Sequence, residues 1–360
     1  MVTKKFWKNR RVLITGHTGF KGTWLSLWLN LLGARVAGYA LDPPTQPSLF
    51  NLSGIKSNIE SIIGDIRNDA KVRQVISDVK PEIIFHLAAQ PLVRHSYEYP
   101  LETYSTNVMG TGNILEAIRT TGSVKAFVNV TTDKVYQNRE WHWGYRENDP
   151  LGGYDPYSSS KACSELVTTA YRNSYFHPDN YKEHGVGIAT ARAGNVIGGG
   201  DWAQDRLIPD CIRAFLRNES IYIRNPDAIR PWQYVLEPLK GYLMLAGKLY
   251  SNGNVFSRAW NFGPDAEGEK SVGWIASYLL KELGSENSIV IDKSPSPHEA
   301  KYLKLDCSLS RAELSWEPKW GIGKAMKATA EWTIAYKKGG DIAKTCEKQI
   351  FEFSKPSDGD

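Results

Sequence analysis

The sequence predicts an α/β fold, with a doubly wound parallel sheet in its first half and a smaller, less regular region after it. Apolar runs typical of strands alternate with amphipathic runs typical of helices up to about residue 190. Strands that are apolar along their whole length are typical of a parallel sheet with helices on both faces. After residue 190 the alternation stops, and proline, glycine and aromatic residues become frequent.

The individual elements follow from these runs. Short apolar runs predict strands at 10–16, 35–41, 58–65, 82–89 and 126–132. Apolar residues at helical spacing predict helices at 21–33, 69–79, 104–121 and 157–175. Gly33 is expected to end the first helix, because glycine readily adopts the left-handed conformation found there.

Three glycines follow the first strand directly, in the stretch "TGHTGFKG". Gly16, Gly19 and Gly22 are spaced three residues apart where the first helix begins. Glycine allows a sharp turn and lets backbone N–H groups approach a pyrophosphate, which then lies at the positive end of the helix. The position of this pattern between strand and helix predicts a Rossmann-type sheet that binds a dinucleotide.

Acidic or small residues end the next strands. Asp42 can accept hydrogen bonds from both hydroxyls of an adenosine ribose, and it would repel a 2′-phosphate. It therefore favours NAD over NADP, although a turn residue before Pro43 and Pro44 is the alternative interpretation. Asp65, in "GDIRN", can meet the adenine amino group. The stretch "HLAAQ" (86–90) ends in small residues, which leaves room for a flat cofactor.

The composition argues against several functional classes. The 360 residues carry a net charge of +5, and the sequence lacks the concentrated basic face of a nucleic-acid binder. No stretch approaches the ~20 apolar residues of a membrane span. The four cysteines are far apart, which predicts reduced thiols and a cytoplasmic location. The histidines show no metal-ligand spacing, so no metal is expected.

These observations divide the chain into two parts. Residues 1–190 are predicted to form an NAD-binding Rossmann domain. Residues 191–360 are predicted to form mainly a substrate domain, with some later segments returning to the first sheet.

A second signal lies in "YDPYSSSKACSE" (154–165). Asp155 is a good helix N-cap, and Pro156 suits the first helical position. Tyr157 and Lys161 then lie one turn apart on the same helix face. A phenol with a pKa of about 10 is a poor base at neutral pH, but a neighbouring ammonium and a nicotinamide cation favour the phenolate. The pair is therefore predicted to act as an activated phenol, although an exposed Tyr and Lys on a surface helix would show the same spacing.

In their order along the chain, these motifs resemble the extended short-chain dehydrogenase/reductase family. The resemblance covers most of the chain and is carried by "TGHTGFKG", "GDIRN", "HLAAQ", "NVMGTGN", "TTDKVY", "YSSSK", "ARAGNVIGGGDW" and "RPWQYV". It implies that Tyr157 is the catalytic tyrosine, that Lys161 binds the nicotinamide ribose and that Thr132 hydrogen-bonds the sugar 4-hydroxyl. The implied NAD site comprises Gly16, Gly19, Phe20, Gly22, Asp42, Asp65, Ile66, Leu87, Ala88, Ala89, Thr106, Tyr157 and Lys161.

The stretch "TTDKVY" (131–136) indicates which branch of this family the chain resembles. After Thr132, most sugar-nucleotide 4,6-dehydratases have Asp-Glu, whereas this chain has Asp133 and Lys134. That departure, with "GNVIGGGDW" and the overall length, resembles the CDP-glucose branch of these enzymes. The resemblance implies a lyase that converts CDP-D-glucose to CDP-4-keto-6-deoxy-D-glucose and water, with NAD regenerated at each turnover. It also implies a place in deoxysugar synthesis for cell-surface polysaccharide such as lipopolysaccharide O-antigen.

The implied reaction gives each member of this pair a role. Oxidation at C4 acidifies the C5 hydrogen, which a base removes while an acid protonates the departing 6-hydroxyl. Our hypothesis is that Lys134 is the C5 base and Asp133 the O6 acid. An amine base requires a pKa lowered by burial and nearby positive charge, whereas Asp133 must retain a proton. The two can also share one proton as a coupled unit, and a surface salt bridge at a strand end is the structural alternative.

A CDP-sugar carries a diphosphate, for which the forked donors of arginine are well suited. Asn195 lies in a glycine loop, and Arg206 is expected near the start of a helix, where a solvated helix face is its alternative interpretation. By resemblance, Arg230, expected just before a short strand, is a phosphate clamp. By resemblance too, His298 lines the nucleotide pocket, although Ala300 stands where an arginine is often found.

The expected partners are CDP-glucose and further copies of the chain. By resemblance, apolar faces of helices 104–121 and 157–175 form an intersubunit four-helix bundle, which gives a homodimer or a larger tetramer. No nucleic acid and no membrane is expected as a partner.

Three alternatives stay open. An NAD-dependent nucleotide-sugar 4-epimerase has the same fold but yields no 6-deoxy product. A 4,6-dehydratase of another nucleotide sugar is equally compatible, because no residue defines base choice on physical grounds. A non-enzymatic NAD-binding regulator would keep the fold without needing Tyr157, Lys161, Asp133 and Lys134 together.

Overall fold

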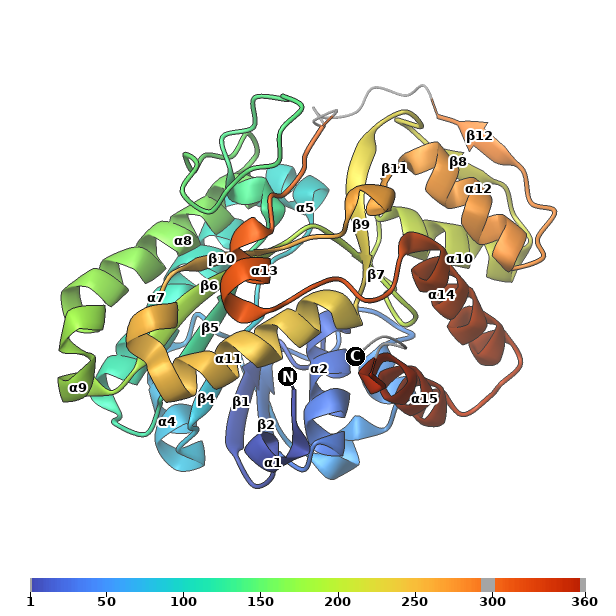
Figure 1. Cartoon of the computed structure of the whole chain (residues 1–360). Coiled ribbons are helices and arrows are strands. Elements are labelled where there is room, and N and C mark those ends of the chain that lie inside the picture. Colours follow the sequence, from blue (N-terminus) through green and yellow to red (C-terminus); the bar gives the residue numbers. More distant parts are fainter. Residues whose placement is uncertain (1, 293–301, 357–360) are drawn as a thin grey trace.

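The computed structural model describes residues 2–292 and 302–356, and its centre is a parallel sheet (Figure 1). Within the described residues this sheet has seven strands, in the order β10, β6, β5, β4, β1, β2, β3, and every neighbouring pair is parallel. Its strands are β1 (Arg11–Thr15), β2 (Arg35–Ala40), β3 (Glu60–Ile63), β4 (Ile83–His86), β5 (Ala126–Val130), β6 (Gly187–Ala193) and β10 (Ala259–Phe262). The order reverses at β1, and ligands of such sheets bind at the carboxyl strand ends beside the reversal. The predicted Rossmann-type fold is confirmed.

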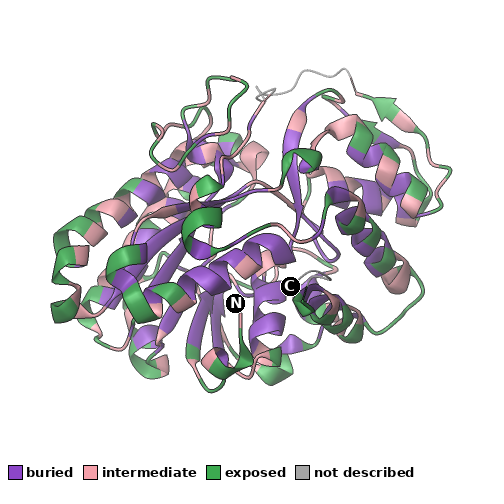
Figure 2. Cartoon of the chain, viewed as in Figure 1, coloured by how far each residue is buried: buried purple, intermediate pink, exposed green. Residues whose placement is uncertain are grey.

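Helices cover both faces of this sheet. On one face lie α4 (Asp69–Val79), α7 (Gly110–Thr120) and α8 (Pro156–Tyr175), which share an apolar core with Leu13 of β1. On the other face lie α1 (Lys4–Trp7), α2 (Phe20–Leu31) and α11 (Leu236–Phe256), which share a core with Val12 and Ile14. Neighbouring residues of β1 thus enter different cores, because side chains alternate along a strand. Figure 2 shows the inner strands buried along most of their length and exposed residues on the outer sides of the helices, whereas the edge strand β3 has no buried residue.

The predicted helix 104–121 is built from three segments. It begins as α6 (Pro100–Tyr104), continues as a π-helical turn, η2 (Ser105–Met109), and ends as α7. Asn107 in this turn donates to Gln90 O at 3.0 Å and to Ser160 Oγ at 2.8 Å, and accepts from Gln90 N at 2.8 Å. The turn therefore ties the segment after β4 to α8, in keeping with the frequent placement of π-turns at functional sites.

The second part of the chain forms two small sheets. One contains β7 (Asn195–Ile197), β9 (Ile229–Tyr234) and β11 (Glu269–Ser271), and the other contains β8 (Ile221–Ile223) and β12 (Ile289–Ile291). The larger helices near them are α10 (Leu207–Arg217), α12 (Val272–Glu282) and α14 (Ile322–Lys337). The other helices are α3 (Leu49–Leu52), η1 (Ile55–Asn58), α5 (Val93–Glu98), η3 (Asp133–Val135), η4 (Pro178–Asn180), α9 (Tyr181–His184), η5 (Ala266–Gly268), α13 (Ser308–Leu314) and α15 (Ile342–Ser354).

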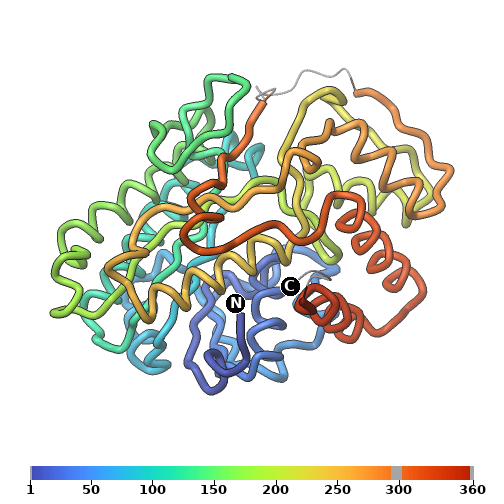
Figure 3. Tube along the Cα trace, viewed as in Figure 1, coloured from blue at the N-terminus to red at the C-terminus, as the bar shows by residue number. Residues whose placement is uncertain are grey.

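Later segments return to the large sheet, as the trace in Figure 3 shows. β10 pairs with β6, and α11 contacts β5 and β6 through a buried face. α15, which the sequence patterns do not predict, packs on α2 with the ring centroids of Phe353 and Trp28 5.7 Å apart. Residues from both ends of the chain therefore belong to one apolar core.

Candidate active site

The glycine turn lies at the carboxyl end of β1. Gly16 has a φ of +77°, and a Cβ added there would lie 2.7 Å from Ala88 N. A Cβ on Gly22 would lie 2.1 Å from Gly16 O, so only glycine lets α2 pack this closely on the turn. Gly19 is the N-cap of α2 and Phe20 is its first residue. The predicted spacing therefore places the start of α2 at the edge of the sheet.

The other predicted cofactor residues lie along the same edge. Asp42 follows β2 and is exposed. Asp65 follows β3, and hydrogen bonds from the Arg67 side chain (Nη2 to Oδ2, 2.5 Å) hold its pKa below the usual value. Ile66 is buried, in close contact with Gly110 at the start of α7. The remaining residues are half-buried after β4 and in η2, namely Leu87, Ala88, Ala89 and Thr106.

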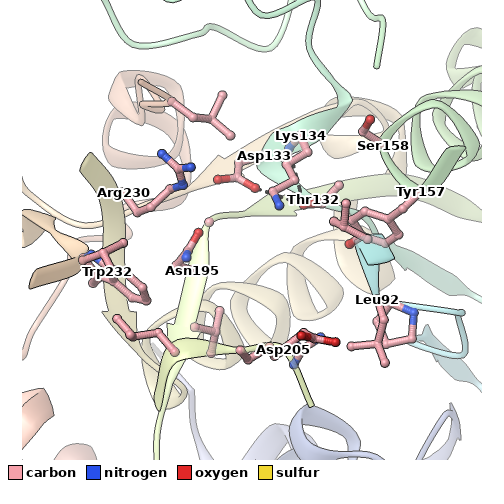
Figure 4. Close-up of a pocket in the computed structure, with 18 of the residues that line it drawn as sticks. Leu92, Thr132, Asp133, Lys134, Tyr157, Ser158, Asn195, Asp205, Arg230 and Trp232 are labelled. Atoms are coloured by element: carbon pink, nitrogen blue, oxygen red, sulfur yellow. Dashed lines mark hydrogen bonds between the residues drawn. The ribbon is translucent and has the colours of Figure 1, made fainter. Parts of the chain in front are cut away.

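A cavity of about 560 Å³ lies beside this edge and is lined by both parts of the chain (Figure 4). The predicted catalytic and substrate residues that line it are Thr132, Asp133, Lys134, Tyr157, Asn195, Arg206 and Arg230, and Phe20 lines it as well. Lys161 is not among the lining residues and is buried, with 4% of its surface exposed. His298 lies outside the described residues.

α8 positions the predicted tyrosine and lysine. Asp155 accepts from Ser158 N at 2.9 Å, and Ser158 Oγ accepts from Asp155 N at 3.1 Å, which forms a capping box with Pro156 in the first turn. Tyr157 faces the cavity, and Lys161 Nζ donates to Val130 O at 2.9 Å. The predicted start of the helix is therefore confirmed.

In the ligand-free protein, burial dominates the pKa values of both Tyr157 and Lys161. Burial raises the pKa of Tyr157 to about 12, against the opposing effects of its hydrogen bond with Thr132 and the charge of Arg206. Burial and the charge of Lys21 lower the pKa of Lys161 to about 7. In the ligand-free protein, the loss of hydration therefore affects the pKa of Tyr157 more than the positive charge of Lys161 does.

Asp133 and Lys134 form the short 3₁₀ turn η3 directly after β5. Asp133 is 2% exposed, its Oδ1 accepts from Thr132 Oγ1 at 3.0 Å, and its Oδ2 has no hydrogen-bond partner in the described part of the chain. Burial raises the pKa of Asp133, although the charges of Lys134 and Arg230 oppose the shift. This environment favours a protonated carboxyl group.

Lys134 is half-buried rather than buried, and its side chain points into the cavity beside Asp133 (Figure 4). Among the described residues it forms no ion pair with Asp133. The surface salt bridge that the sequence allowed is therefore not formed.

The second part of the chain supplies the opposite wall. Asn195 is the first residue of β7, and Arg206, the N-cap of α10, donates from Nη1 to Asp201 Oδ2 at 3.1 Å. Arg230 was expected just before a strand but is the second residue of β9, because pairing with β11 already begins at Ile229. Arg230 is 9% exposed and lies beside Asp133 in Figure 4.

Several charged residues near the cavity did not stand out in the sequence. Lys21 and Asp201 line the cavity, and Glu165 and Arg192, which do not line it, form a buried ion pair at 2.9 Å. Two signals could have revealed this pair. Glu165 lies one turn beyond Lys161 on the same helix face. Arg192 interrupts an apolar strand, and such a residue requires a buried partner.

Comparisons with known proteins identify the family. The family model for GDP-mannose 4,6 dehydratase matches residues 13–329. A CDP-glucose 4,6-dehydratase of Salmonella typhimurium strain LT2 is 55% identical over 98% of this chain and 98% of its own. The chain belongs to the CDP-glucose 4,6-dehydratase family. The family membership predicted from the sequence is therefore confirmed.

Solved structures show the fold of the family. An epimerase of Methanothermobacter thermautotrophicus matches with a TM-score of 0.80 and 22% identity, covering 94% of this chain and 97% of its own. A dTDP-glucose 4,6-dehydratase of Streptomyces venezuelae with NAD bound matches with a TM-score of 0.77 and 22% identity, covering 92% and 99%. Within the described residues, no cluster of metal-ligating side chains occurs and no helix could cross a membrane.

Proposed function

We propose that the protein is an NAD-dependent CDP-glucose 4,6-dehydratase, a lyase that releases water and yields CDP-4-keto-6-deoxy-D-glucose. The observation that carries this proposal is the gathering of Tyr157, Asp133 and Lys134 around one cavity. A 4-epimerase has no need of an acid and a base after Thr132, whereas a 4,6-dehydratase needs both. The 55% identity to the Salmonella enzyme supports CDP-glucose as substrate.

The glycine turn fits a bound dinucleotide. The backbone around Gly16 and Gly22 is packed so closely that no Cβ fits, and the N-terminus of α2 beside it suits a pyrophosphate. Asp42, exposed at the end of β2, supports NAD rather than NADP. When bound, NAD accepts a hydride from C4 of the hexose and returns it to C6.

Tyr157 takes the proton of the 4-hydroxyl during oxidation. Its pKa of about 12 keeps the phenol protonated in the ligand-free protein, so substrate and cofactor must complete its activation. Thr132 lowers the pKa of this phenol, and by family resemblance it binds the same sugar hydroxyl. By family resemblance, Lys161, one turn after Tyr157 on α8, would hold the nicotinamide ribose.

Asp133 and Lys134 carry out the elimination. Burial raises the pKa of Asp133 and its Oδ2 has no hydrogen-bond partner among the described residues, both of which suit a carboxyl group that protonates the 6-hydroxyl as it departs. Lys134 lines the same cavity without an ion pair to Asp133 and would remove the C5 hydrogen. It must first lose its own ammonium proton, which the positive charge of oxidised NAD would favour when bound. The two groups stand side by side at the cavity wall, as C5 and C6 of one hexose require.

The diphosphate lies on the wall formed by the second part of the chain. Asn195, Arg206 and Arg230 supply the amide and the two guanidinium groups that line it there. Asp201 fixes the direction of Arg206, which reduces the entropy lost when a phosphate binds.

The proposal includes a homodimer and a cytoplasmic location. Leu166 on α8 and Met109 before α7 are 57% and 60% exposed, which is the apolar surface that a second copy would cover. The four cysteines are unpaired, as expected in a reducing compartment.

The test is incubation of the protein with NAD and a panel of CDP-, dTDP-, UDP- and GDP-glucose in D₂O. We expect turnover of CDP-glucose, with loss of the 6-hydroxyl and deuterium at C5 in the product. A product that keeps its 6-hydroxyl and is inverted at C4 would instead establish an epimerase. Faster turnover of another nucleotide-glucose would support the dehydration reaction but contradict the assignment of CDP-glucose as the substrate.

A further inference from the structure

We propose that Glu165 and Arg192 are positioning residues, which hold the turn carrying Asp133 and Lys134 against the helix carrying Tyr157 and Lys161. The inference rests on the proposed function, because it assigns the pair a part in the elimination step. It extends that function to residues that do not line the cavity.

The pair is buried and fully engaged. Arg192 donates from Nε to Glu165 Oε1 and from Nη2 to Glu165 Oε2, both at 2.9 Å, and the side chains are 4% and 2% exposed. The Glu165 oxygens also accept from Thr131 Oγ1 and Thr190 Oγ1, each at 2.6 Å. Burial opposes ionisation of Glu165, but these partners outweigh it and hold its pKa below the usual value.

The same pair binds both ends of the catalytic turn. Thr131, just before Thr132 and η3, is bound to Glu165. Tyr136, just after η3, accepts from Arg192 Nη1 at 2.8 Å through its hydroxyl. The residues between Thr131 and Tyr136 are Thr132 and η3, which carries the proposed acid and base. Displacing the ion pair would therefore move both of its ends.

Consecutive residues at the end of β5 each form a hydrogen bond with a side chain of α8. Asn129 Nδ2 donates to Ser164 Oγ at 2.9 Å, Val130 O accepts from Lys161 Nζ at 2.9 Å, and Thr131 donates to Glu165. Tyr157, Lys161 and Glu165 follow one another at one-turn spacing on this helix. The helix that presents the oxidation residues thus also sets the position of the elimination residues.

The ionic character of the pair supports a positioning role. Burying two charges costs them much of their hydration energy, so a protein with an apolar pair of similar volume is often equally stable. Stability alone therefore does not explain an ion pair at this place. A bidentate arginine–carboxylate contact, however, fixes direction as well as distance, which apolar packing does not. A displacement of about 1 Å in a reacting group can slow catalysis about a hundredfold.

Two threonines offer a matched test. Thr131 and Thr190 are both buried and both donate to Glu165 at 2.6 Å, but Thr131 precedes the catalytic turn whereas Thr190 lies inside β6. Thr131→Val and Thr190→Val each remove one such bond and preserve side-chain shape. Rates of NADH formation and of water loss are measured for each variant by single-turnover kinetics with CDP-glucose, together with the melting temperature.

We expect Thr131→Val to slow water loss relative to C4 oxidation at least about tenfold, so that NADH accumulates. Thr190→Val should keep the wild-type ratio of the two rates, with a similar fall in melting temperature. Tyr136→Phe, at the other end of the turn, should reproduce the Thr131→Val ratio. Equal ratios in the two threonine variants would overturn the inference and leave a purely structural pair. Failure of the wild-type protein to dehydrate CDP-glucose would instead overturn the proposed function.

Discussion

Asp133 and Lys134 are neighbours in the sequence but have different environments, so their substitutions should differ in effect. Asp133→Asn removes the proton donor of a 2% exposed side chain at nearly constant size. We expect dehydration to fall at least about a hundredfold while C4 oxidation continues. NADH absorbance should therefore build up, and C5 should still exchange with D₂O because the base is intact.

Lys134→Met is the matched variant. It should retain NAD binding and C4 oxidation but lose deuterium incorporation at C5, which NMR of the recovered nucleotide sugar would detect. C5 exchange at the wild-type rate in Lys134→Met would show that another group is the base.

The pKa of Tyr157 predicts the pH dependence of the oxidation step. A group that must lose its proton to act, with a pKa of about 12 in the ligand-free protein, limits the rate at neutral pH. In Asp133→Asn, the single-turnover rate of NADH formation should therefore rise with pH from 6 to 9, by up to about tenfold per unit. A flat profile over this range would show that the phenol is already ionised. Tyr157→Phe serves as the inactive control.

At the scale of elements, the contact of α2 with the glycine turn controls cofactor binding. A Cβ at position 22 would meet Gly16 O at 2.1 Å, so Gly22→Ala must push the helix off the turn. We expect a loss of about 1–3 kcal/mol in the free energy of unfolding and a clear loss of NAD affinity by calorimetric titration.

Gly247→Ala is its control. This glycine lies inside α11, where a new Cβ would meet, among the described residues, only the Phe6 ring, at 3.8 Å. It should raise the free energy of unfolding by about 0.5–1 kcal/mol and leave NAD affinity unchanged. NAD binding that survives Gly22→Ala would contradict the assigned cofactor edge.

At the scale of the whole molecule, the exposed apolar face of α8 predicts self-association. Leu166→Glu places a charge at the proposed interface and should convert dimers to monomers in light-scattering measurements. Phe351→Glu is the matched control, because Phe351 is 66% exposed on α15, on another surface. Dimers that persist in Leu166→Glu at wild-type strength would place the interface elsewhere.

Much of the architecture was predictable because it depends on local periodicity. The first five strands and α4 lie where apolar runs indicated, and α8 begins at the predicted cap, Asp155, since each depends on neighbouring residues. Elements stabilised by distant contacts were less predictable. α15 is an example, because its burial depends on α2 and α14, and the π-turn in 104–121 depends on Asn107 meeting Gln90 and Ser160.

The sequence alone determined the Rossmann-type sheet, the glycine turn and the chemical identity of the proposed reacting groups, because spacing and residue type carry that information. Only the tertiary structure decided their environments. Burial sets the direction of the pKa shifts of Tyr157 and Asp133. The ion pair of Glu165 and Arg192 joins α8 to β6, which are distant in sequence. Hydration and long-range contacts depend on which atoms surround a group, and those atoms come together only when the chain folds.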